Sequence, residues 1–195
     1  LAALVACVAA LAAGLGRLSS LWPVRGLSVV YIELFRGTSL LVQLYWIFFV
    51  LPLFGISLPK FEAGFLSVGL NVGAYGAEIV RGAIQAVPRG QWEAGYALSM
   101  SPAKRMRRII LPQALVLMLP PWGNLMIELL KGTALVALIA VPDLMFVAKQ
   151  INGATFRSAE AFGAALVIYY LLARVLITPA MRGLERAMAR RLGRA

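Results

Sequence analysis

Four polar or charged side chains follow one another along an otherwise apolar stretch in the second half of the chain. Asn124 and Glu128 are four residues apart, which places them on one face of a helix, and Lys131 and Thr133 follow. Ionisable groups inside a membrane span are costly, so by default they indicate a functional site. This set could hold the amine and the carboxylate of a zwitterionic solute. Hydrogen bonding between helices is the alternative use, and the sequence leaves both open.

A second group of polar side chains lies in earlier apolar stretches. Glu78 and Arg81 are three residues apart, and the simplest interpretation is an ion pair on one helix face. Polar groups of this kind either join helices or line a path for a solute. The candidate pathway residues are therefore Gln43, Asn71, Tyr75, Glu78, Asn124, Glu128, Lys131 and Thr133.

The residue types that the chain lacks narrow its chemistry. It contains no histidine, which removes the commonest general base and metal ligand, and Cys7 is its single cysteine. No lysine is followed by Ser or Thr, so the end of a P-loop is missing and ATP must be bound elsewhere. Without a G-x-S-x-G elbow or a metal-binding carboxylate pair, an intramembrane enzyme has little support. We expect no cofactor or metal on this chain.

Composition predicts an all-α protein that crosses a membrane several times. The chain is 61% hydrophobic over 195 residues, with a mean hydropathy of +0.83, whereas soluble domains are about 45–50% apolar. Its net charge of +11 comes from short basic clusters between apolar stretches. Membrane topology explains that pattern better than binding to nucleic acid does.

Five apolar stretches are predicted to be transmembrane helices in a single domain, 1–195. They cover about 1–16, 23–55, 61–82, 113–130 and 159–178. The first is interpreted as a span that begins within its helix rather than as a signal peptide, because no basic region precedes it. The second is too long for one crossing and is interrupted at 36–38, so its first part is expected to project beyond the bilayer.

Small residues, prolines and glycines refine these elements. Gly69 and Gly73, with Ala77 next, form a small-residue stripe suited to close helix packing. The pair Pro120 and Pro121 is expected to bend the fourth span. Residues 131–157 are predicted to form a short or partly re-entrant helix and an outer loop, and residues 180–195 a basic tail.

The basic residues predict the orientation of the five spans. The residues that this arrangement places on one side, 14 of the 19, are Arg17, Arg25, Arg36, Arg81, Arg89, Lys104, Arg105, Arg107, Arg108, Arg182, Arg186, Arg190, Arg191 and Arg194. Because positive residues accumulate on the cytoplasmic side, the loop after the third span and the C-terminus are expected there, and the N-terminus outside. Arg36 is the weakest assignment, since it could also lie within the membrane.

The stretch 88–112, PRGQWEAGYALSMSPAKRMRRIILP, has the character of two short surface helices joined by a turn. Pro88 can open the first helix, and Ser101 with Pro102 is typical of an N-cap followed by proline. A loop that only sets topology is the plainer alternative. The stretch also resembles the EAA loop of binding-protein-dependent ABC importer permeases, whose pattern is EAA, three residues, G, nine residues, I, one residue, LP.

The spacing of that pattern is intact in this chain, with two substitutions. Glu93, Ala94 and Gly95 occupy the EAA positions, Ser99 replaces the glycine, and the pattern ends at Leu111 and Pro112 after Ile109. A serine at a turn that requires positive φ would tighten or strain the bend. By the resemblance, Gly90 also belongs to the loop, Glu93 fixes it by capping or pairing, Ala94 and Gly95 let a partner surface approach, and Ser99 sets the bend.

Further stretches resemble the polar amino acid subfamily of these permeases, from about residue 31 to 146. They include FRGTSLLVQ at 35–43, AYGAEIVRG at 74–82 and the run LPQA at 111–114. The resemblance implies the type I ABC importer permease fold in a bacterial inner membrane and solutes such as histidine, arginine, glutamate, glutamine or ectoine. It also implies a second permease chain, the same or similar, two ATPase subunits that carry ATP and Mg²⁺, and an extracytoplasmic binding protein. An ATP-independent channel or secondary transporter is the alternative.

Overall fold

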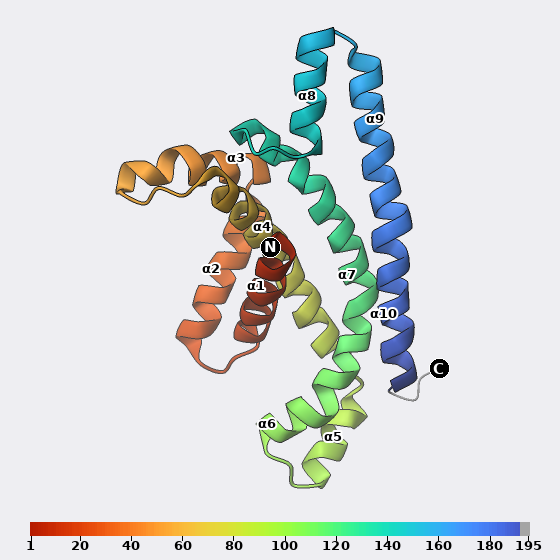
Figure 1. The fold of residues 1–195 in the computed structure, drawn as a ribbon. Coiled ribbons are helices and arrows are strands. Elements are labelled where there is room, and N and C mark those ends of the chain that lie inside the picture. Colours follow the sequence, from red (N-terminus) through yellow and green to blue (C-terminus); the bar gives the residue numbers. More distant parts are fainter. Residues whose placement is uncertain (192–195) are drawn as a thin grey trace.

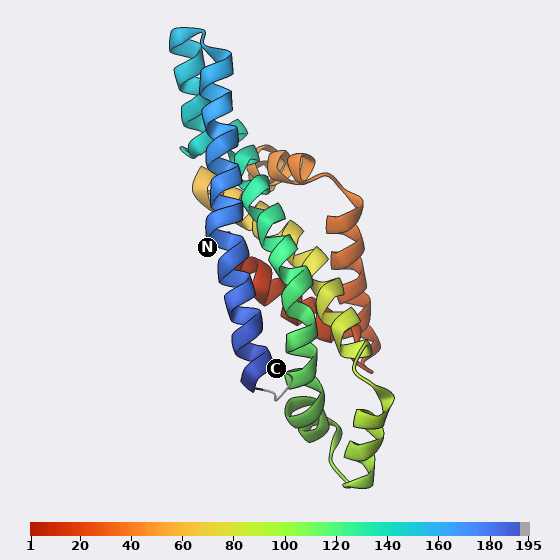
Figure 2. The ribbon, with the colours of Figure 1, turned by 90° about the vertical axis from the view of Figure 1, so that its right-hand side faces the viewer.

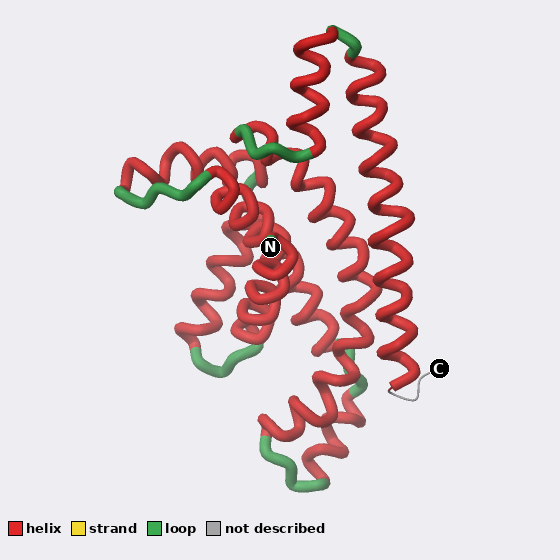
Figure 3. Tube along the Cα trace, in the orientation of Figure 1, coloured by secondary structure: helices red, strands yellow, loops and turns green. Residues whose placement is uncertain are grey.

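The structure is a computed structural model that describes residues 1–191, and helices account for nearly all of them (Figures 1 and 3). The helices in chain order are α1 (Ala2–Arg17), α2 (Trp22–Gly37), α3 (Leu40–Tyr45), η1 (Trp46–Val50), η2 (Leu51–Phe54), α4 (Lys60–Gln85), α5 (Arg89–Ala97), α6 (Pro102–Arg105), η3 (Met106–Ile110), α7 (Leu111–Thr133), η4 (Ala134–Ile139), α8 (Leu144–Thr155), α9 (Ser158–Leu171), η5 (Leu172–Ile177) and α10 (Thr178–Arg191). The described residues contain no strand. The predicted all-α class is confirmed.

Three continuous helices are long and apolar enough to cross a membrane: Lys60–Gln85, Pro102–Ile139 and Ser158–Met188. The pair α2 and α3–η2 makes a fourth candidate if the two halves count as one broken span, and α1 is a shorter apolar helix of 16 residues. The structure therefore contains three to four of the five predicted spans by length and composition, and α1 is shorter than a full span.

The central helix of the bundle is α4, which packs against α1, α2 and α7. Small residues allow this packing. A Cβ atom added to Gly69 would lie 2.7 Å from Cβ of Val5, and one added to Gly73 would lie 2.8 Å from Cβ of Ala9. The predicted small-residue stripe therefore lets the α1 backbone approach α4 closely, and that prediction is confirmed.

The second predicted span is wrong in one respect. The chain turns by 107° between α2 and the α3–η2 segment, which runs sideways from the bundle in Figure 1. Thr38 has extended backbone angles, φ −123° and ψ 155°, which end α2 at the predicted interruption. The excess length is therefore taken up by a sharp bend and not by a straight extension beyond the membrane.

The fourth predicted span begins earlier than expected. Helix α6 continues through the π-helical turn η3 into α7, so a single helix runs from Pro102 to Ile139. In η3 the amide of Leu111 donates to the carbonyl of Met106, five residues back. Such a wide turn accommodates the ring of Pro112, which cannot take part in an ordinary α-helical ladder. The helix also continues through Pro120 and Pro121 as one element.

The remaining segment forms a helical hairpin at the end of the bundle opposite α5 and α6 (Figure 1). Asp143 caps α8 by accepting a hydrogen bond from the amide of Phe146 at 2.8 Å, and α8 packs against α9. The predicted re-entrant helix therefore corresponds to η4 and α8, with a tight connection to α9. The predicted fifth span continues through η5 into α10, so the basic tail is helical up to Arg191, and residues 192–195 lie outside the described residues.

Most of the basic residues that were predicted to share one side of the membrane lie at one end of the bundle, and Arg36 is the exception. The α1–α2 connection, α5 with α6, and the C-terminal part of α10 all lie at one end in both Figure 1 and Figure 2. Arg36 does not share this end, because it lies at the far end of α2, where its guanidinium stacks over the ring of Tyr75 at 5.4 Å. The side chain of Arg36 is thus exposed but held against Tyr75 of α4.

Candidate functional site

The loop after α4 is a compact helix–turn–helix unit. Helix α5 ends in a Schellman motif, in which the amide of Met100 donates to the carbonyl of Gly95 at 3.0 Å and that of Ser99 donates to Tyr96 at 2.8 Å. Ser99 occupies the left-handed position of this motif, with φ 49°. The expectation that a serine stands at a positive-φ turn is confirmed. Ser101 then caps α6 through the amide of Lys104, at 3.4 Å.

Replacing Ser99 by glycine should therefore stabilise the loop. A side chain in the left-handed region costs about 1–2 kcal/mol, part of which is offset by the greater freedom of glycine in the unfolded chain. We expect Ser99→Gly to raise stability by about 0.5–1 kcal/mol and Ser99→Val to lower it, because β-branched residues avoid positive φ. Thermal unfolding of the purified chain checks both, and a stable valine variant would contradict the assignment.

Arg105 joins the two arms of the loop. Its side chain is 5% exposed, and its guanidinium lies 3.6 Å from the ring centroid of Tyr96 and 5.8 Å from that of Trp92. These cation–π contacts press the stem of Arg105 onto Gly95, where an added Cβ would lie 2.5 Å from Cδ. The loop is therefore held together by its own side chains. Sequence reasoning counted Arg105 only as a surface charge.

Most of the predicted loop residues are accessible to a partner. Gly90, Glu93 and Ala94 are exposed on α5, as are Tyr96 and Leu98 beside them. Glu93 forms no ion pair with any described residue, so its predicted role in fixing the loop is not seen within the chain.

Two predictions about the loop are wrong: the role of Gly95 and the separate second surface helix. Gly95 is buried and faces Arg105, so it serves the interior of the loop and not the approach of a partner. The second predicted surface helix, α6, is the first turn of the long helix. Leu111 and Pro112, which are partly buried, lie within that helix and tie the loop to the span.

Two candidate pathway residues, Gln43 and Asn71, are brought together at the bend between α2 and α3. The amide of Asn71 donates to Oε1 of Gln43 at 3.0 Å and to the carbonyl of Phe35 at 3.1 Å. Gln43 also donates to Phe35, at 2.9 Å, and to the hydroxyl of Thr38, at 2.7 Å. Both side chains donate hydrogen bonds to carbonyl groups that lose their helical partners where α2 ends. Inside a membrane such groups need a partner within the protein, because no water is available. They hold the bend in place.

Glu78 forms the predicted pair with Arg81 and a second pair that the sequence did not reveal. Its Oε2 accepts from Arg81 at 2.8 Å, and its Oε1 accepts from Arg17 of α1. Arg17 lies 61 residues away in sequence, so no local pattern could have indicated this contact. Glu78 therefore ties α1 to α4. Tyr75, one turn earlier on α4, carries the stacked Arg36.

The polar residues of α7 form an exposed stripe. Asn124, Glu128 and Lys131 are all exposed, and Nζ of Lys131 donates to Glu128 at 2.8 Å. Thr133 donates to the carbonyl of Leu130 at 2.7 Å, where α7 changes into the 3₁₀ turn η4. The structure thus places these four residues along a single helix and surrounds none of them completely.

The bend between α2 and α3 lies beside the end of α7, where the long helix tightens into the 3₁₀ turn η4. A Cβ added to Gly132, at the end of α7, would lie 3.2 Å from the side chain of Leu40, the first residue of α3. A discontinuous helix, here α2 with α3, is typical of the solute-binding regions of transporters. The bend held by Gln43 and the end of the polar stripe on α7 therefore adjoin in space.

A comparison with protein families agrees with this architecture. The model of the binding-protein-dependent transport system inner membrane component matches residues 6–190. The chain belongs to this family. It is accordingly a permease, a transport component and not an enzyme, which removes the intramembrane-enzyme alternative.

Relatives and a solved structure that are similar in sequence to the permease come from amino acid ABC transporters. The chain is 47% identical over 175 residues to a probable amino-acid ABC transporter permease protein, y4tF, of Sinorhizobium fredii, covering 87% of this chain and 74% of the relative. It is 37% identical to the glutamine transport permease GlnP of Escherichia coli, covering 93% and 83%. A crystal structure of an amino acid ABC transporter with histidines matches with a TM-score of 0.87 at 38% identity, covering 95% and 86%. The type I importer permease fold is confirmed.

Proposed function

We propose that the chain is the membrane subunit of an ATP-driven importer for a polar or zwitterionic amino acid-like solute. ATP and Mg²⁺ are bound by two separate ATPase subunits, which dock on the loop 88–112. The observation that carries this proposal is the loop itself. Its exposed α5 surface is rigidly braced by Arg105, and its second arm is continuous with a span. The family relationship supports the same division of labour.

The continuity of the loop with α7 suggests how force is transmitted. From Pro102 to Ile139 the chain is one helix, so a displacement of α6 by a docked subunit moves α7 as a rigid body. Gly132, in the last third of this helix, packs on Leu40 at the bend of the second span. A movement at the loop is therefore delivered to the place where the long helix meets that bend.

The exposed polar stripe supports a second permease chain. Glu128 and Lys131 are exposed on an otherwise apolar helix, and such groups are not left facing lipid. A second chain, identical or similar, would cover this face and leave a polar path between the two subunits. An amine and a carboxylate on the solute would find Glu128 and Lys131 as partners. Names of the relatives favour amino acids as the solute class.

The proposed orientation follows from the charges. The α5–α6 end of the bundle, which is rich in arginine, faces the cytoplasm together with the C-terminus, and the N-terminus lies outside. A solute-binding protein would deliver its cargo to the opposite end, near the α8–α9 hairpin.

The test is co-purification of the permease with its ATPase subunit in detergent, comparing wild type with Glu93→Arg. Reversing the charge of an interfacial group commonly costs several kcal/mol, so we expect the amount of bound ATPase to fall at least about tenfold. Glu62→Arg is the matched control, because Glu62 is an exposed carboxylate at the other end of α4 that forms no ion pair with any described residue. Equal binding by all three proteins would favour the ATP-independent channel or secondary transporter.

A further inference from the structure

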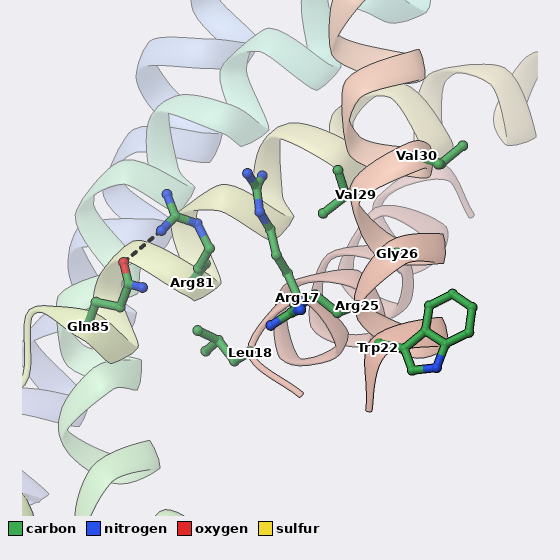
Figure 4. A pocket seen from close by; sticks show the side chains of 9 residues that line it. All are labelled: Arg17, Leu18, Trp22, Arg25, Gly26, Val29, Val30, Arg81 and Gln85. Atoms are coloured by element: carbon green, nitrogen blue, oxygen red, sulfur yellow. Dashed lines mark hydrogen bonds between the residues drawn. The ribbon is translucent and has the colours of Figure 1, made fainter. Parts of the chain in front are cut away.

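A basic pocket lies between α1, α2 and α4, apart from both the loop and the polar stripe. It has a volume of about 600 Å³. Three arginines line it, Arg17, Arg25 and Arg81, together with Trp22 and Gln85 (Figure 4). No carboxylate is among the residues that line this pocket.

The arginines retain unused hydrogen-bond donors. Glu78 accepts one bond from Arg17 and two from Arg81, and Gln85 accepts another from Arg81. Oε1 of Glu33 also lies 3.8 Å from Nη1 of Arg17, beyond hydrogen-bond distance. A guanidinium has five N–H groups, so Arg17 keeps most of its donors. Arg25 is exposed and forms no ion pair with any described residue. The pocket therefore carries a net positive charge, because the neighbouring carboxylates neutralise only part of the charge of the three arginines. Guanidinium groups with free N–H donors are well suited to bind a phosphate group.

The position of the pocket matches the headgroup level of a bilayer. The connection between α1 and α2 cannot lie in hydrocarbon, because its backbone groups need water or other polar partners. Trp22, which begins α2, is 77% exposed, and tryptophans at such positions anchor helices at the interface. Further along α2 the pocket wall becomes apolar, with Val29 and Val30 on the side toward the membrane interior. A phosphate at the arginines would thus carry acyl chains along this wall.

We infer that this pocket binds the phosphodiester headgroup of an anionic phospholipid, such as phosphatidylglycerol. Basic pockets between spans commonly hold anionic headgroups. Arg25 supplies the free cation, Arg17 adds donors from α1, and Trp22 covers the glycerol region. A bound lipid would bridge α1, α2 and α4 at the end of the bundle where the loop begins.

The test is native mass spectrometry of the purified permease titrated with phosphatidylglycerol or with phosphatidylcholine of the same acyl chains. One arginine near a headgroup is worth about 1 kcal/mol, so Arg25→Gln should weaken binding of phosphatidylglycerol about fivefold. Binding of phosphatidylcholine should not change. Arg182→Gln is the matched control, since Arg182 is an exposed arginine of α10 that does not line the pocket.

Three results would overturn the inference. Equal affinity of wild type and Arg25→Gln for phosphatidylglycerol would exclude the pocket as the site. Equal losses in Arg25→Gln and Arg182→Gln would show a general attraction to surface charge. Displacement of the lipid by inorganic phosphate at millimolar concentration would identify a site for free phosphate. The lipid site requires a loss specific to Arg25 that excess phosphate does not reproduce.

Discussion

Replacing Gly76 by alanine is expected to destabilise the whole bundle. A Cβ atom at this position would lie 2.7 Å from the indole ring of Trp122 and 2.8 Å from Cβ of Ala10. Neither neighbour can move freely, because Trp122 packs in the core between α4 and α7, and Ala10 is fully buried on α1. Overpacking of this kind costs about 1–3 kcal/mol. Thermal unfolding in detergent, followed by loss of the monodisperse peak in size-exclusion chromatography, measures the effect.

The same helix provides the matched control. A Cβ added to Gly82 meets nothing within 4 Å, so Gly82→Ala adds the same methyl group to α4 without a clash. We expect it to leave stability unchanged or to raise it by up to about 1 kcal/mol, because alanine is the better helix former. If Gly76→Ala is as stable as Gly82→Ala, the close packing of α1, α4 and α7 is incorrect.

The second large effect is expected at Gly95, where the loop loses its brace. In Gly95→Ala the new Cβ would lie 2.5 Å from Cδ and 2.7 Å from Cγ of Arg105, so the arginine must leave its place against Tyr96. The two arms of the loop then separate. If the loop couples the permease to ATPase subunits, transport driven by ATP should fall at least about fivefold, which corresponds to about 1 kcal/mol. Uptake of a labelled amino acid into proteoliposomes containing the complex measures it.

A double variant makes this prediction specific. Adding Arg105→Ala to Gly95→Ala removes the group that the new methyl displaces, so the pair should be less impaired than the sum of the two single variants. The family pattern has alanine at the position of Gly95. We infer that this chain has glycine there because the side chain of Arg105 occupies the space that an alanine methyl group would need. Gly153→Ala, an open position on α8, is the control for a glycine replacement elsewhere. Strictly additive losses would show that Gly95 and Arg105 do not act together.

Several polar residues in the spans proved to hold the fold together. Gln43 and Asn71 satisfy the backbone at the bend, and Glu78 joins α1 to α4. In a membrane, a polar side chain that bonds inside the protein is stabilising for the same reason that one facing lipid is costly. The candidates that are exposed in the single chain are Asn124, Glu128 and Lys131 of α7 and Tyr75 of α4, and contact of any candidate with solute stays a prediction.

Local patterns were sufficient for much of this protein. The cap at Ser101 and the glycine stripe at 69 and 73 are properties of neighbouring residues, and each led to a correct feature. Apolar length located the helices but missed the bend of the second stretch and the early start of the fourth. The positive φ of Ser99 could be expected for the same reason, since a turn between two helices imposes it.

Only the tertiary structure decided which surfaces meet. The ion pair of Arg17 with Glu78 spans 61 residues, and the stacking of Arg36 on Tyr75 depends on how α2 leans on α4. The 107° turn after α2 and the burial of Gly95 against Arg105 likewise depend on packing. Sequence periodicity shows which face of a helix is apolar, but the partner of that face, and of each polar group on it, is set by the packing of all the helices together.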